Sequence, residues 1–188
     1  IIAEKPSLGR NIASALGLKK RGNGYIEGEK YIVSWAFGHL FELSDVDDYF
    51  GRKMKWKEVE LPFIPGKFKF KLKESRGIAE QFEILKNLME REDVEGIINC
   101  GDADREGQII IDRIIKESKT QKEVYRLWLP EQTKETIVEE VKNIKPDREY
   151  IRLAFEGYSR TVMDWLFGIN LTRYITLKSG QLMPVGRV

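Results

Sequence analysis

The chain has 188 residues, a formal net charge of +2, 41% hydrophobic residues and 33% charged residues. This length allows one sizeable core, or one domain with part of another. Its single cysteine, Cys100, excludes an internal disulfide and is compatible with a reducing cytoplasm. One cysteine and one histidine are too few for the usual structural zinc site, and no apolar run approaches the roughly 18 residues of a membrane span.

Apolar periodicity predicts alternating strands and helices along most of the chain. Strands are expected at 1–3, 25–27, 31–36, 67–73, 96–100 and 124–129. Helices are expected at 9–16, 78–89, 109–115, 134–141, 150–155 and 159–174. Residues 19–24 should form a basic turn and residues 45–65 an irregular excursion. Such alternation predicts an α/β domain with a mainly parallel sheet flanked by helices.

The helical pattern beyond Pro146 suggests a second domain. We therefore expect a first domain at 1–145, with a hairpin insertion at about 19–73, and a partial helical domain at 146–188. The chain opens on a strand-like segment without an initiator Met and ends in PVGRV without a helix stop. We accordingly expect a fragment of a longer protein.

The most informative stretch places Asp102, Asp104 and Glu106 at alternate positions directly after the strand at 96–100. Like charges on one face of an extended segment repel one another, and a divalent cation commonly stabilises them. An EF-hand calcium loop does not fit, because its twelfth position would be Arg113 and a strand precedes it. The alternative is a solvated acidic turn in which Glu106 interacts favourably with the helix dipole.

Other candidates lie where the first strand and the first hairpin end. Glu4 follows the first strand, and ligands collect at this edge of open α/β sheets. Lys5 is either a phosphate contact there or an exposed lysine at a helix start. His39, the only histidine, is either a phosphate ligand or a turn residue without a function. Arg160 and Asp164 are four residues apart, so they share a helix face and could simply pair at the surface.

With these residues in place, the chain resembles the N-terminal part of a type IA DNA topoisomerase, closest to the topoisomerase III branch. The resemblance covers nearly the whole chain in the family's order. The motifs that carry it are IIAEKPSLGR at 1–10, WAFGHL at 35–40, GDADREGQ at 101–108, RLWLPEQT at 126–133, SRTVMDWLFGINLTR at 159–173 and VGRV at 185–188. Gln108 is a small departure, because many topoisomerase I relatives have glutamate there.

The resemblance implies a Toprim domain with Mg²⁺ bound by Asp102, Asp104 and Glu106, mainly by the two aspartates. It implies an acid/base role for Glu4 and an active-site role for Lys5. DNA contacts are assigned to His39, Arg105, Arg160 and Asp164. The expected activity is ATP-independent relaxation of negatively supercoiled DNA through a transient 5′-phosphotyrosine link.

None of the tyrosines at 25, 31, 49, 125, 150, 158 and 174 stands in the context of the family's nucleophile. We therefore expect the chain to supply the metal and acid/base half of the site without the catalytic tyrosine, and to be inactive alone. Expected partners are single-stranded and negatively supercoiled DNA, for a cytoplasmic, nucleoid-associated monomer. The alternatives are the topoisomerase half of a reverse gyrase, and a Toprim nucleic-acid-binding module without strand chemistry.

Overall fold

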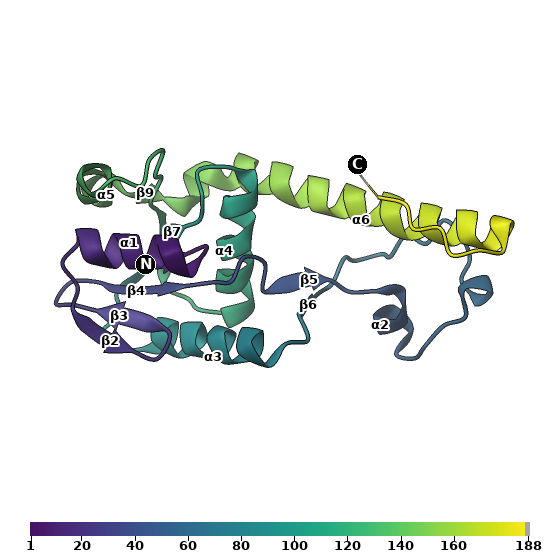
Figure 1. The fold of residues 1–188 in the computed structure, drawn as a ribbon, viewed down its shortest axis with the longest axis horizontal. Helices are drawn as coiled ribbons and strands as arrows, with labels where there is room; N and C mark the ends of the chain where they lie inside the picture. Colours follow the sequence, from purple (N-terminus) through teal and green to yellow (C-terminus); the bar gives the residue numbers. More distant parts are fainter. Residues whose placement is uncertain (187–188) are drawn as a thin grey trace. The chain divides into compact units, whose positions relative to one another are not determined.

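The computed structural model describes residues 1–186, which fall into two compact units that are considered separately (Figure 1). Unit 1 comprises Ile1–Phe41 and Leu72–Gly157, and unit 2 comprises Glu42–Lys71 and the chain from Tyr158 onward. The last two residues of the VGRV motif, 187 and 188, lie outside the described residues. Within residues 1–186, no helix combines the length and the apolar character needed to cross a membrane.

A seven-stranded sheet in the order β2-β3-β4-β1-β7-β8-β9 organises unit 1. Its strands are β1 (Ile2–Ala3), β2 (Lys20–Gly22), β3 (Tyr25–Glu27), β4 (Ile32–Trp35), β7 (Gly96–Cys100), β8 (Glu123–Arg126) and β9 (Lys145–Pro146). The central strands β4, β1, β7 and β8 are parallel, and the outer strands pair antiparallel. Consequently the carboxyl ends of the four central strands meet at one edge.

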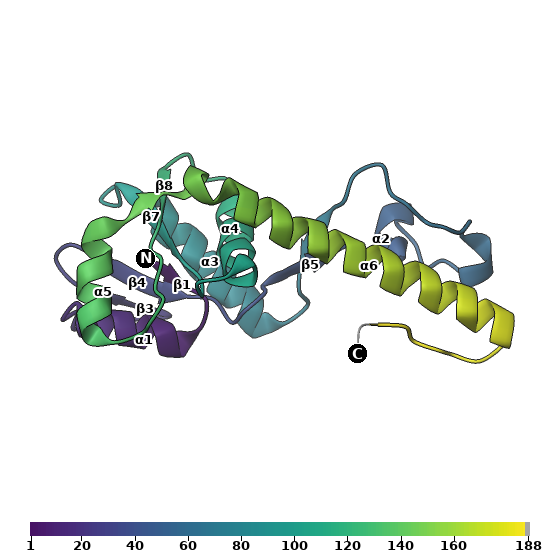
Figure 2. The same cartoon turned by 90° about the horizontal axis from the view of Figure 1, so that it is seen from above.

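Helices cover both faces of this sheet. They are α1 (Pro6–Ala15), α3 (Arg76–Glu90), α4 (Arg105–Ser118) and α5 (Lys134–Glu140), with short 3₁₀ turns η2 (Val141–Asn143) and η3 (Asp147–Tyr150). Helices α1 and α5 pack together on one face, and α3 and α4 pack together on the other (Figure 2). Successive side chains of β7 point to opposite faces of the sheet. Ile98 and Cys100 share one face, where they form a buried cluster with Leu8, Ile12 and Ile137 of the neighbouring helices.

Unit 2 is built around aromatic contacts. It contains α2 (Val46–Phe50), η1 (Trp56–Glu58) and the larger part of α6 (Ile151–Ser179). Strands β5 (Phe41–Leu43) and β6 (Phe70–Leu72) form a separate two-stranded sheet. The rings of Phe63 and Trp165 lie 6.2 Å apart, and Asn170 exchanges hydrogen bonds of 2.6 and 3.0 Å with the Phe63 backbone.

The α/β fold with a mainly parallel central sheet is confirmed, while several element boundaries differ from expectation. The expected basic turn at 19–24 contains β2, because an antiparallel partner at Tyr25–Glu27 converts it into a hairpin. The lysine-rich strand expected at 67–73 is ordered as a strand only at Phe70–Leu72. The two helices expected after Tyr150 are one continuous helix, α6. Residues 45–65 contain α2, which Asp45 caps through a reciprocal capping box with Asp48.

The compact units do not coincide with the expected domains. Strands β2, β3 and β4 belong to the main sheet of unit 1, whereas residues 42–71 belong to unit 2. The units divide again at Gly157, inside α6, rather than near residue 145. This division describes compactness, and the domain boundary at 145/146 stays a prediction.

Candidate active site

The pairing of β1 with β7 brings two sequence motifs to one edge of the sheet. Ala3 is registered with Cys100, so Glu4 and Gly101 follow the last paired residues of two adjacent parallel strands. Asp102 is the next residue of the loop that leads to α4. Two carboxylates almost a hundred residues apart in the sequence therefore meet at the carboxyl edge, where ligands of open α/β sheets collect.

Direct hydrogen bonds join the two motifs. The backbone N–H of Asp102 donates to Glu4 Oε2 at 3.0 Å, and Lys5 Nζ lies 2.6 Å from Asp102 Oδ2. The hydrogen bond to Asp102 raises the pKa of Lys5, which burial partly opposes. Lys5 is thus a cation held against the acidic loop, and it remains partly accessible to solvent.

Asp104 shapes the start of α4. It is the N-cap residue, with extended backbone, and its Oδ1 accepts a hydrogen bond from the Gly107 N–H at 2.7 Å. The two glycines of the motif allow an unusually close backbone approach. A Cβ at Gly101 would lie 1.9 Å from Gly107 O, and a Cβ at Gly107 would lie 2.4 Å from both the backbone N and O of Asp102. The loop can therefore fold against the helix start only with glycine at both positions.

Glu106 and His39 face each other, with 3.4 Å between Oε2 and Nε2. The turn that presents His39 is tied to the first strand, because Gly38 has φ of +70° and its N–H donates to the Glu4 carbonyl at 3.0 Å. Arg105 pairs with Glu156 in the same unit. Unit 1 thus joins three chain segments by direct contacts, and these segments carry Glu4, Lys5, His39, Asp102, Asp104, Arg105 and Glu106.

Arg160 and Asp164 belong to unit 2. Their side chains pair with each other, 3.8 Å apart between Nε and Oδ2, and each is more than a third exposed. This is the surface pair that their spacing allows. Their expected role in DNA binding stays a prediction.

Arg126, which the sequence alone did not mark as a site residue, holds the backbone of the acidic loop in place. Its guanidinium is fully buried and donates to the carbonyls of Gly101 at 3.0 Å, Asp102 at 2.8 Å and Leu127 at 2.8 Å. It also lies 4.9 Å from the ring of Trp128. Burial lowers the pKa of Arg126. The signal available in the sequence was an arginine inside the apolar run VYRLWL, where a buried charge needs several partners.

A second support that the sequence did not reveal is a buried polar network. Asn99 Oδ1 accepts from the Gly101 N–H at 3.1 Å, and Asp147 Oδ1 accepts from Gln108 Nε2 at 3.0 Å and Asn99 Nδ2 at 3.3 Å. The start of η3 is thereby linked to the backbone of the acidic loop. Burial raises the pKa of Asp147, although its two amide donors favour the ionised form.

Within residues 1–186, no group of three or more His, Cys, Asp or Glu side chains is gathered in a geometry that would hold a metal ion. The donor chemistry nevertheless suits Mg²⁺, which prefers a few carboxylate oxygens and several waters. Asp102 and Asp104 each engage one carboxylate oxygen, with Lys5 and Gly107 respectively, and keep the other for a ligand.

Cys100, in contrast, has no nucleophilic character. It is fully buried at the end of β7, and desolvation raises the pKa of its thiol to about 12. Cys100 therefore behaves as a small buried hydrophobe.

Comparisons with known proteins identify the family to which the chain belongs. The Toprim domain family model matches residues 1–132. Over all 188 residues the chain is 38% identical to DNA topoisomerase 3 from Bacillus licheniformis and from Bacillus subtilis, and 39% identical to DNA topoisomerase 3 from Bacillus cereus. The chain spans 26% of the length of each of these relatives.

Among solved structures, full-length topoisomerase I from Thermotoga maritima has a similar fold. The TM-score is 0.63 at 24% sequence identity, over 93% of this chain and 25% of that one. The chain belongs to the Toprim family, and along its whole length it is a relative of the topoisomerase III branch of type IA topoisomerases.

Proposed function

We propose that this chain forms the metal-binding and acid/base half of the DNA cleavage–religation site of a type IA DNA topoisomerase. Its substrates would be single-stranded and negatively supercoiled DNA. The complete enzyme would be a monomer that works without ATP, in the cytoplasm at the nucleoid. The relatives are named DNA topoisomerase 3, and this supports DNA as the substrate.

One observation carries the proposal. Glu4 and Lys5 from the end of β1 contact Asp102 from the end of β7, through Asp102 N to Glu4 Oε2 and Lys5 Nζ to Asp102 Oδ2. An acid/base group, a cation and an acidic loop thereby meet at one point. A phosphodiester placed there would face a proton donor and a positive charge, as general acid–base catalysis on a phosphate requires.

In the proposed reaction, a tyrosine from outside these 188 residues releases its hydroxyl proton to solvent as its oxygen attacks the phosphorus of one strand. The new bond joins the tyrosine oxygen to phosphorus, the bond to the 3′-oxygen breaks, and Glu4 gives its proton to that oxygen. Religation reverses each step: Glu4 takes the proton back as the 3′-hydroxyl attacks and the tyrosine leaves. Lys5, held beside Asp102, would fix the orientation of the phosphate.

Asp102, Asp104 and Glu106 would hold Mg²⁺, the first two through the oxygens that Lys5 and Gly107 leave free. When bound, the ion would stabilise the negative charge on the phosphate oxygens of the DNA backbone. The chain's own residues set this arrangement: Asp104 is fixed by its cap to Gly107, and Lys5 neutralises part of the acidic charge in the absence of metal.

Metal binding tests the acidic half directly. Calorimetric titration of the chain with Mg²⁺ should show weak binding, and Asp102→Asn/Asp104→Asn should weaken it by more than about tenfold. Glu29→Gln/Glu95→Gln removes the same charge from exposed carboxylates at the other edge of the sheet and should leave binding unchanged. Equal loss in the two double variants would mean that the ion responds only to net charge, and would overturn the assignment.

Activity tests the acid/base half. The isolated chain should not relax plasmid DNA, because it lacks the nucleophile. In a full-length enzyme carrying this segment, Glu4→Gln should cripple strand cleavage while DNA binding persists, since glutamine keeps the hydrogen bond to Asp102 but cannot transfer a proton. Wild-type cleavage by that variant would remove Glu4 from the mechanism.

A further inference from the structure

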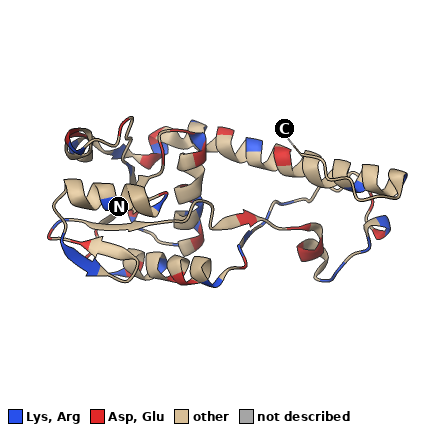
Figure 3. Ribbon diagram, viewed as in Figure 1, with Lys and Arg blue, Asp and Glu red and all other residues tan. Residues whose placement is uncertain are grey.

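Unit 2 carries a basic segment that the proposed site does not use. Arg52, Lys53, Lys55 and Lys57 are all exposed, and Trp56 stands between the last two lysines. Lys and Arg recur along the chain between α2 and β6, as the blue segments of the ribbon show (Figure 3). Such a local concentration of positive charge indicates a phosphate-binding surface more directly than the net charge of the whole chain does.

The lysines of this segment are not neutralised by neighbours. Arg52 approaches Glu58, with 3.5 Å between Nη1 and Oε2. Within residues 1–186, Lys53, Lys55 and Lys57 form no ion pair. Three adjacent ammonium groups without carboxylate partners are therefore available to an anionic ligand.

Trp56 is held in place from the interior of unit 2. The guanidinium of Arg173, on α6, lies 5.4 Å from the centre of the Trp56 ring and is only 5% exposed. Arg173 Nη2 lies 3.8 Å from Asp45 Oδ1, while the buried Nη1 has no hydrogen-bond partner within the described residues. This cation–π contact fixes the indole, which is only half-buried and so keeps an accessible surface.

We propose that Lys53–Lys57 is a contact site for single-stranded nucleic acid, in which Trp56 stacks on a base and the lysines pair with flanking phosphates. Fixed aromatic rings beside lysines are the usual means of binding single strands without sequence preference. A duplex keeps its bases stacked inside and offers none to Trp56, and an acidic peptide would use the lysines alone. This inference rests on the proposed function only in taking DNA as the natural ligand.

Fluorescence anisotropy with a labelled oligothymidylate tests the site on the intact chain. Lys53→Ala/Lys55→Ala/Lys57→Ala should reduce the slope of log affinity against log salt by about 2, because each phosphate contact contributes roughly 0.7 for single strands. The control Lys19→Ala/Lys30→Ala/Lys142→Ala removes the same charge from exposed positions of unit 1 and should leave the slope nearly unchanged.

Trp56 gives a second, independent readout. Trp56→Ala should lower affinity for the single strand by about tenfold or more, whereas Trp56→Phe should keep most of it, since a phenyl ring still stacks. Circular dichroism checks that each variant is folded, and the salt slope of the lysine variant decides the matter if Trp56→Ala unfolds unit 2. Affinity for a duplex of the same length should not depend on Trp56.

The outcomes separate this inference from the proposed function. Oligonucleotide binding that is as strong in the lysine and Trp56→Ala variants as in the control, with equal salt slopes, overturns the contact site and leaves the Mg²⁺ and cleavage tests standing. Equal binding of polyglutamate and oligothymidylate, insensitive to Trp56, also overturns it. Loss confined to the lysine and Trp56→Ala variants supports it, even if a full-length enzyme proves unable to cleave.

Discussion

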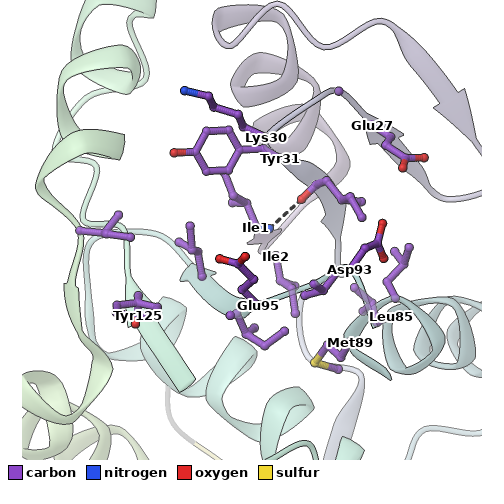
Figure 4. Close-up of a pocket in the computed structure, with 18 of the residues that line it drawn as sticks. Ile1, Ile2, Glu27, Lys30, Tyr31, Leu85, Met89, Asp93, Glu95 and Tyr125 are labelled. Atoms are coloured by element: carbon purple, nitrogen blue, oxygen red, sulfur yellow. Dashed lines mark hydrogen bonds between the residues drawn. The ribbon is translucent and has the colours of Figure 1, made fainter. Parts of the chain in front are cut away.

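The two edges of the seven-stranded sheet differ in what they contain. At the carboxyl edge, Glu4, Lys5 and Asp102 from adjacent strands are joined by direct hydrogen bonds. At the amino edge lies a pocket of about 570 Å³, lined by apolar side chains such as Ile2, Leu85 and Met89 together with acidic groups (Figure 4). The motifs with Glu4, Lys5 and Asp102 lie at the edge opposite to this pocket.

Two carboxylates of the amino edge, Glu27 and Asp93, are already paired with a neighbouring arginine. Glu27 and Asp93 both bind Arg91, at 2.9 and 2.6 Å, and the hydrogen bond from Arg91 lowers the pKa of both. Our proposed site therefore follows the convergence of polar groups at the ends of parallel strands rather than the size of a cavity. The following predictions test this contrast with matched changes at the two edges.

The largest effect is expected from removing the cation beneath the acidic loop. Arg126→Met should lower the free energy of unfolding by about 3–5 kcal/mol, because the carbonyls of Gly101 and Asp102 lose a fully buried charged donor. Urea denaturation measures the change, and methionine keeps most of the side-chain volume.

Arg91→Met is the matched change at the amino edge. Arg91 is about 30% exposed and its partners reach solvent, so the cost should stay below about 1 kcal/mol. Similar costs for the two arginines would show that the acidic loop does not depend on Arg126, and the contrast between the edges would lose its structural basis.

Glycine positions at the two ends of β7 give the next largest contrast. Gly101→Ala should cost about 3 kcal/mol, because the new Cβ meets the Gly107 backbone at 1.9 Å and one of the two segments must move. Gly96→Ala should cost under about 1 kcal/mol, because its closest neighbour is the Tyr125 ring edge at 3.0 Å. Thermal denaturation compares the two, and Gly101→Ala should also weaken Mg²⁺ binding. An equal cost at both ends would contradict the close backbone approach.

Much of the carboxyl edge could be anticipated from the sequence because its signals are local. The apolar run at 96–100, the alternating Asp102, Asp104 and Glu106, and the helix after them predict a strand, a loop and a helix without further information. The same reasoning applied to the first strand makes Glu4 a candidate site residue. The rule that ligands collect at the carboxyl edge of such sheets places both motifs at one edge, whereas the direct pairing of the two strands became known only from the fold.

The supports of the site could not be anticipated, since they depend on tertiary contacts. Arg126 reads as one polar residue at the end of a strand until its carbonyl partners across β7 are known. Asp147 follows Pro146 at the start of the expected helical segment, and only the fold places it beside Asn99 and Gln108. The length of α6 was missed because Glu156 and Gly157 interrupt the apolar pattern without ending the helix.

The smallest expected effect concerns Asp147, and its sign is specific. Burial raises the pKa of this carboxyl above its ordinary value near 3.8, so the folded state holds the proton more tightly than the unfolded state. The resulting loss of stability of the folded state is absent below pH 3.8 and develops as pH rises through the raised pKa.

Asp147→Asn keeps an acceptor for Gln108 and Asn99 but cannot ionise. The free energy of unfolding of this variant, relative to the wild type, should therefore increase between about pH 4 and pH 7. Glu149→Gln, an exposed neighbour in η3, serves as the control for removal of one charge. A relative stability that stays constant or decreases with pH would mean that the two amide donors outweigh burial, and that the polar network under the acidic loop favours the ionised carboxylate.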